Sequence, residues 1–172
     1  DLQLPKPPYH MECFDNSNIQ GEYPVASCVV FRNCKPSNKE YKHFNIKTVE
    51  GPDDFASMRE IVYRRYGRLK AEGKPLPDLV IVDGGKGQLS AAVESLTALE
   101  LMGKVPIIGI AKRLEEIYFP GEQYPLCVDK RSNSLKVIQH IRDEAHRFGI
   151  TFHRNKRSKG TFRTELCDID GI

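Results

Sequence analysis

The chain has 172 residues, the size of one ordinary domain, and 40% of them are hydrophobic, which is enough for a sizeable core. Its longest apolar runs, 79–82 and 105–111, fall far short of the roughly 18 residues that a membrane-spanning helix needs. The first ten residues lack the cationic start and apolar core of a signal peptide. These features exclude a membrane protein, a coiled coil, a collagen and a disordered tail.

Charge and cysteine content bear on partners and compartment. Lysine and arginine number 26 and aspartate and glutamate 23, so the net charge of +3 permits nucleic-acid binding without requiring it. The five cysteines are odd in number and form no CxxC pair, which argues against a disulfide framework and a zinc ribbon. Reduced thiols fit the cytosol best, so we expect a cytoplasmic location.

The first part of the chain predicts an antiparallel meander. Residues 1–10 contain three prolines and predict an extended lead-in. Short segments that are rich in strand-forming residues and bounded by turn residues predict strands at 11–15, 25–31 and 41–48. Because their connections are short, we expect these three strands to pair antiparallel.

From residue 51 the apolar residues follow the pattern of alternating helices and buried strands. The pattern predicts helices at 55–71, from the turn 84–87 to 101, and at 134–149. It predicts buried strands at 79–82 and 105–111, and a small hairpin at 118–128 between the last strand and the last helix. Three antiparallel strands followed by βαβα predict an α/β fold. It is a mixed sheet with helices on its faces, in one domain.

Two aspartates lie where predicted strands end. Asp15 ends the first strand and Asp83 follows the strand 79–82 and enters a glycine-rich turn. If these strands are neighbours, both carboxylates lie at one edge of the sheet, where sites of open α/β sheets form. Close carboxylates repel unless they share a cation, so the pair predicts a Mg²⁺ or Mn²⁺ site. The alternative for each aspartate is a turn former or helix cap.

The turn 84–88 and His146 are further candidates. The turn lacks the GxxxxGK[ST] spacing of a nucleotide-binding P-loop. Its glycines still allow backbone N–H groups to approach a phosphate beside Lys86, the alternative being a tight strand-to-helix turn. His146 lies about 140° around its predicted helix from the apolar Ile141, so we expect it off the buried face. It is a candidate metal ligand, general base or ordinary surface group.

Basic residues are concentrated in a few segments. The segment 151–163 carries five of them and no acidic residue. Others interleave with tyrosines in the predicted helix 55–71. Lys112 and Arg131 lie beside strand ends that are expected to border the carboxylates. Basic runs are most often solvated faces. Several of them around one carboxylate pair indicate binding of a phosphate backbone.

Five segments closely resemble the UvrC family, the nuclease subunits of bacterial nucleotide excision repair. They are CFDNSNIQG (13–21), VEGPDDFASMRE (49–60), LPDLVIVDGGKGQL (76–89), PIIGIAKRLEEIYFPG (106–121) and IRDEAHRFGITFHR (141–154). The resemblance covers roughly residues 10–165 and matches the family's C-terminal endonuclease domain, which has an RNase H-like fold. It implies a metal-dependent DNA endonuclease that makes the 5′ incision beside a lesion.

The resemblance also implies roles for individual residues. Asp15, Asp83 and His146 match the family's catalytic groups, with Asp15 and Asp83 as ligands of Mg²⁺ or Mn²⁺, and Asp54 is a supporting candidate. His146 would deprotonate or steady the attacking water, or join the metal shell. We expect phosphate and DNA contacts from six basic residues, Lys86, Lys112, Arg131, Arg154, Lys156 and Arg157.

The same resemblance implies a domain organisation and partners. Residues 1–10 are expected to be the lead-in, 11–155 the RNase H-like endonuclease domain, and 156–172 a basic linker towards a helix-hairpin-helix domain that is absent here. We therefore expect an excised, monomeric domain that acts on damaged double-stranded DNA and contacts no membrane. UvrB would be reached through other regions of the full-length chain, and UvrA indirectly.

Two other function classes give different expectations. A catalytically silent RNase H-like module would only dock DNA or a repair partner, and such a module has no need of Asp15, Asp83 and His146 together. A phosphate-binding metabolic enzyme predicts a nucleotide-binding fingerprint, which the sequence lacks.

Overall fold

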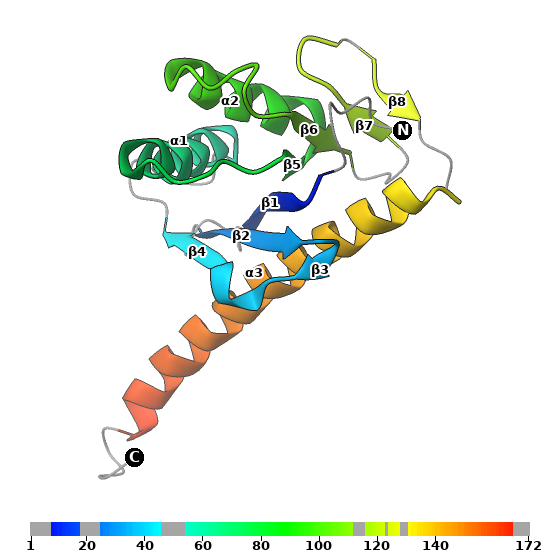
Figure 1. The fold of residues 1–172 in the computed structure, drawn as a ribbon. Helices are drawn as coiled ribbons and strands as arrows, with labels where there is room; N and C mark the ends of the chain where they lie inside the picture. The colour runs from blue at the N-terminus through cyan, green and yellow to red at the C-terminus, as the bar shows by residue number, and fades with distance from the viewer. Residues whose placement is uncertain are drawn as a thin grey trace.

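A mixed β-sheet lies at the centre of the part of the chain that the computed structural model describes, residues 8–17, 25–45, 54–111, 116–122, 124–127 and 131–166. Within these residues the sheet has eight strands, of which seven follow the order β3-β2-β1-β5-β6-β7-β8, and the eighth, β4, pairs with β2 (Figure 1). The strands are β1 (His10–Ser17), β2 (Val25–Arg32), β3 (Lys35–Pro36), β4 (Lys42–Asn45), β5 (Leu79–Asp83), β6 (Ile107–Ile110), β7 (Glu116–Tyr118) and β8 (Leu126–Cys127).

The directions of the strands confirm the predicted mixture of pairings. β2 pairs antiparallel with β1 and with β4, which is the predicted meander. β5 runs parallel to β1 on one side and to β6 on the other. β7 and β8 form the predicted small hairpin at the far edge. The first strand of the meander, β1, and the first strand of the part that follows it, β5, are therefore neighbours, as the carboxylate site requires.

Helices cover both faces of the sheet (Figure 1). The helices α1 (Asp54–Glu72) and α2 (Gly85–Ala98) pack on one face, and α3 (Asn133–Leu166) packs on the other. Because side chains alternate along a strand, β1 contributes Phe14 to the core beneath α1 and α2, and Met11 and Cys13 to the core beneath α3. The site described below depends on this division.

The last helix is longer than predicted. The sequence pattern ends it at 149, whereas α3 continues to Leu166 and includes the first residues of the expected basic linker (Figure 1). A lone glycine costs a helix only about 1 kcal/mol, and no proline follows Pro125 to stop this one. Residues 1–7 of the lead-in and 46–48 of the third predicted strand lie outside the described residues.

None of the helices in the described ranges has both the length and the apolar character needed to cross a lipid bilayer.

Candidate active site at the edge of the sheet

Asp15 and Asp83 meet at the edge of the sheet where β1 and β5 end. The parallel register pairs Phe14 with Val82, so the two aspartates occupy the next position on neighbouring strands, which lie about 4.8 Å apart. Cys13 and Ile81, two residues earlier, are buried beneath α3. Both carboxylates therefore belong to the face of the sheet that α3 covers, and the predicted juxtaposition of the two strand ends is confirmed.

His146 reaches the same place from α3. Its Nδ1 lies 3.5 Å from Oδ2 of Asp15, and its side chain is 60% exposed where that of Asp15 is 10% exposed. The preceding residue, Ala145, is buried against the sheet. His146 therefore lies at the boundary between the buried carboxylate and solvent, off the apolar face of its helix, as predicted.

Contacts on either side of His146 hold α3 in this position. The hydroxyl of Ser27 on β2 donates a hydrogen bond of 3.0 Å to the carbonyl oxygen of Ala145. The hydroxyl of Tyr41 donates a hydrogen bond of 2.7 Å to the carboxylate of Glu144, and the ring of Phe148 stacks on His43 with centroids 3.7 Å apart. The three contacts fix the turn of helix that carries the histidine.

Burial makes the carboxylate pair hard to ionise. Desolvation, followed by repulsion from Asp83, raises the pKa of Asp15 to about 7, against the opposing effects of His146 and Arg142. Desolvation also raises the pKa of Asp83, and Arg142 and His146 again oppose it. Oδ2 of Asp15 is buried without a hydrogen-bond partner among the described residues. The site therefore holds two buried acidic groups with few protein donors to stabilise their charged forms.

This donor set fits a divalent cation that keeps part of its shell for water and phosphate. A cation between the carboxylates would relieve their repulsion and occupy the unsatisfied Oδ2 of Asp15. The described residues contain no group of three or more histidine, cysteine or acidic side chains arranged to hold a metal by themselves. Mg²⁺ is commonly held by one or two carboxylates together with substrate phosphates, which is what Asp15 and Asp83 offer.

Arg142 is a member of the site that sequence reasoning missed. It lies four residues before His146, one turn earlier on the same side of α3. Its positive charge counteracts the rise in the pKa of both aspartates. Its Nε is buried without a hydrogen-bond partner in the described part of the chain, and Nη2 lies 3.1 Å from Oδ1 of the exposed Asp143. The sequence feature that could have identified Arg142 is its position four residues before the candidate histidine, on the same side of the helix.

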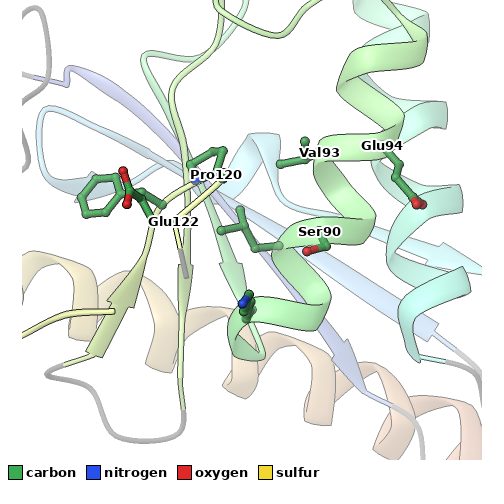
Figure 2. Close-up of a pocket in the computed structure, with 9 residues that line it drawn as sticks. Ser90, Val93, Glu94, Pro120 and Glu122 are labelled. Carbon is green, nitrogen blue, oxygen red and sulfur yellow. The ribbon is translucent and has the colours of Figure 1, made fainter. Parts of the chain in front are cut away.

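Lys86 does not lie on the face of the sheet that carries Asp15 and Asp83. It lines a groove of about 330 Å³ between α2 and residues 119–122, while Asp15 and Asp83 face α3. Figure 2 shows Ser90 and Val93 of α2 facing the segment that carries Pro120 and Glu122, while Glu94 of the same helix points away from that segment. The glycine-rich turn has the positive φ angles of 136° at Gly84 and 80° at Gly85, and it directly connects Asp83 to α2.

Of the other predicted residues, the structure describes the side chain of Arg131 alone, and it lies away from the carboxylates. Arg131 is exposed before α3, and 13 residues of helix, about 20 Å, separate the start of α3 from His146. Lys112 lies outside the described residues. Asp54 begins α1, and Arg154, Lys156 and Arg157 belong to α3, but the structure describes only their backbone. Their roles remain predictions.

Comparison with protein families shows a match to the family described as "UvrC RNAse H endonuclease domain", over residues 1–150. Among curated proteins, the UvrABC system protein C of Flavobacterium johnsoniae is 66% identical over the whole chain and that of Christiangramia forsetii 67%. The UvrABC system protein C of Porphyromonas gingivalis is 66% identical. The chain spans 29% of the length of each of these relatives.

Among solved structures, the Ciona intestinalis endonuclease V in complex with a 24mer DNA is similar, with a TM-score of 0.43 and 18% sequence identity. The match covers 80% of this chain and 56% of that one.

Proposed function

Since this chain belongs to the UvrC RNase H endonuclease domain family, we propose that it hydrolyses a phosphodiester bond of DNA at the site formed by Asp15, Asp83 and His146. The observation that carries the proposal is the convergence of three side chains from β1, β5 and α3 at one edge of the sheet. A docking module has no use for a buried carboxylate pair whose repulsion costs stability. A cation and a phosphate at this edge account for it.

Asp15 and Asp83 are proposed to hold a Mg²⁺ or Mn²⁺ ion. When bound, such an ion polarises the scissile phosphate and lowers the pKa of an attacking water. The aspartates contribute a fixed position, because both are attached to strand ends whose register is set by the paired residues before them. The site is thus built on the rigid part of the fold.

His146 is proposed to accept the proton of the attacking water. Its Nδ1 faces Oδ2 of Asp15 at 3.5 Å. When Nδ1 carries the hydrogen of the neutral ring, Nε2 is unprotonated and can accept a proton. The 60% exposure of the side chain leaves that nitrogen access to solvent and to a substrate. Contacts of this kind in free enzymes are often long and shorten when the substrate binds.

The continuation of α3 offers a path for the flanking DNA. Arg157 and Arg154 follow His146 by 11 and 8 residues, which places them about 20° and 80° around the helix from it. Arg157 lies about 16 Å along the helix axis from His146. We propose that these residues, with Lys156, contact backbone phosphates beyond the cut.

The relatives' name connects this chemistry to repair. We propose that the chain makes the 5′ incision beside a lesion in bacterial nucleotide excision repair, in concert with UvrB and UvrA, as part of a cytoplasmic protein. The chain spans 29% of the relatives' length, so contacts to those partners are assigned to other regions.

The test is to place the chain in the corresponding region of the Flavobacterium johnsoniae protein and to measure both cuts on a duplex with one lesion, labelled at each end. We expect Asp15→Asn, Asp83→Asn and His146→Gln each to abolish the 5′ cut and leave DNA binding intact. Glu100→Gln, at a side chain that is 86% exposed, is the matched control and should cut normally. Normal 5′ cutting by Asp15→Asn would support the docking module instead.

A further inference from the structure

Arg142 has a buried donor without a hydrogen-bond partner, and the Asp15 carboxylate, on which its charge acts, has a buried acceptor without one. Its Nε and Oδ2 of Asp15 are both inaccessible to solvent and make no hydrogen bond with the described residues. A buried charged group without a hydrogen bond costs more than the roughly 1–3 kcal/mol of a neutral one. The acceptor calls for a cation or a donor and the guanidinium donor calls for an anionic acceptor, which a divalent cation and a phosphate would respectively supply.

The contact that Arg142 does make is a weak one. Nη2 lies 3.1 Å from Oδ1 of Asp143, whose side chain is 66% exposed. Exposed ion pairs are worth at most about 1 kcal/mol, and this one joins adjacent residues of the same helix. The pair leaves the Nε edge of the guanidinium uncommitted, while the neighbouring Arg147 forms a bidentate pair with Glu144 away from the carboxylates.

The place of Arg142 in the fold brings this edge to the reaction site. Ile141 and Ala145 are buried against the sheet, which fixes the rotation of α3 and leaves Arg142 and His146 on one side of it. Side-chain exposure is 26% for Arg142 and 60% for His146, so the arginine lies deeper. Both act on the charge of Asp15 and Asp83.

We propose that Arg142 is a further catalytic residue, which donates from its guanidinium to a nonbridging oxygen of the scissile phosphate. The proposal rests on the proposed function of this site. A planar guanidinium matches the geometry of a phosphate and stays charged at every working pH. The guanidinium attracts the phosphate directly, whereas the two carboxylates repel an anion and would act on it only through a bound cation.

The test compares phosphorothioate substrates. The unsubstituted protein, Arg142→Gln and Arg142→Lys cut DNA in which sulfur replaces one or the other nonbridging oxygen at the scissile phosphate. Mn²⁺ is the cation, because it accepts sulfur as a ligand. We expect Arg142→Gln to slow cutting of the normal substrate by roughly 10–100-fold, the range for a lost hydrogen bond between charged groups. The unsubstituted protein should cut one diastereomer more slowly than the other, and Arg142→Gln should lose this discrimination.

A merely structural role predicts a different pattern. In that case Arg142→Gln slows all three substrates by the same factor and keeps the discrimination, which would overturn the proposal. Arg142→Lys keeps the charge without the planar fork, and it covers the case in which the glutamine variant does not fold. It should retain folding and lose the discrimination.

Arg147→Gln removes the same charge from an exposed site on the same helix, and it should match the unsubstituted protein. Absence of cutting by the unsubstituted protein would instead contradict the proposed function, and the role of Arg142 with it.

Discussion

Ser27 donates its hydroxyl to the carbonyl oxygen of Ala145 at 3.0 Å, and so connects the strand beside Asp15 to the residue before His146. In the β1–β2 ladder Ser27 is the residue opposite Asp15. One fully buried hydroxyl thus sets the distance between the two candidate catalytic side chains.

Ser27→Ala should therefore reduce activity more than its cost in stability explains. Loss of one buried hydrogen bond costs about 1 kcal/mol of unfolding free energy, and we expect a severalfold fall in kcat with little change in DNA affinity. Ser57→Ala is the control, because its buried hydroxyl has no partner within the described ranges and its removal should leave stability equal or higher. Urea unfolding and single-turnover cutting measure the two effects. Equal kcat for Ser27→Ala and the unsubstituted protein would contradict the positioning role.

Asp15→Asn should stabilise the metal-free protein at neutral and alkaline pH. The pKa of Asp15 is raised from 3.8 to about 7 by burial and then by Asp83, so between these values the folded state holds a proton that the unfolded state has lost. The free energy of unfolding therefore falls as pH rises through this window. The asparagine variant escapes this loss, and at about pH 8 it should gain on the order of 1–3 kcal/mol.

Urea unfolding with a chelator present, at about pH 4.5 and 8, measures this difference. Asp143→Asn, whose side chain is 66% exposed, should show no such gain. Lower stability of Asp15→Asn at the higher pH would show that the ionised, buried Asp15 carboxylate does not destabilise the folded protein.

A second buried carboxylate, Glu12, should have the opposite pH dependence. It accepts bonds of 2.7 Å from Nε and Nη2 of Arg65 and from the hydroxyl of Tyr66, and it lies 2.8 Å from Nε2 of His10. Burial raises its pKa, but the bonds from Arg65 and His10 prevail and lower it to about 2. Its contribution to stability is thus complete above the ordinary 4.5 and is lost as pH falls from there towards about 2.

Glu12→Gln should cost about 3–5 kcal/mol at neutral pH, because it leaves Arg65 buried without its counter-charge. Glu40→Gln breaks the bidentate pair with Arg32, which is 36–40% exposed, and should cost about 1 kcal/mol or less. Thermal and urea unfolding compare the two variants. Equal losses in the free energy of unfolding would mean that burial does not make the Glu12–Arg65 pair contribute more to stability than the exposed Glu40–Arg32 pair.

Two glycine substitutions should change stability in opposite directions. A Cβ on Gly109 of β6 would lie 3.0 Å from the carbonyl oxygen of Gly85, in the turn that follows Asp83. Gly109→Ala should cost about 1–3 kcal/mol and lower activity by displacing that turn. Gly67→Ala, within α1, has its nearest contact at 3.4 Å and should stabilise by up to about 1 kcal/mol. A stabilising Gly109→Ala would show that the turn is not closely packed there.

Much of this arrangement was predictable from local patterns. The buried runs 79–82 and 107–110 read as parallel strands because they are apolar throughout, and strand ends in such sheets place Asp15 and Asp83 together. The helical position of His146 relative to Ile141 was enough to place it off the core.

Other features depended on tertiary contacts that no local pattern contains. Arg142 is indistinguishable from a solvated arginine until α3 is docked on the sheet, and only then is its Nε buried and its charge close enough to act on the two carboxylates. Lys86 follows Asp83 by three residues, yet α2 directs it to a groove on the other side of the turn. The continuation of α3 past residue 149 was missed because Gly149 directly follows Phe148, the last residue of the apolar stripe, and a glycine in that place is typical of a helix end.

Binding of Mn²⁺, measured by calorimetry at fixed low salt, tests whether Asp15 and Asp83 hold a cation. The unsubstituted protein, Asp15→Asn and the exposed control Glu100→Gln are compared without DNA and with a short duplex. We expect Mn²⁺ to bind to the unsubstituted protein and to the control, and Asp15→Asn to lose this binding. Equal binding by Asp15→Asn would contradict a cation site at the ends of β1 and β5, and with it the proposed hydrolysis there.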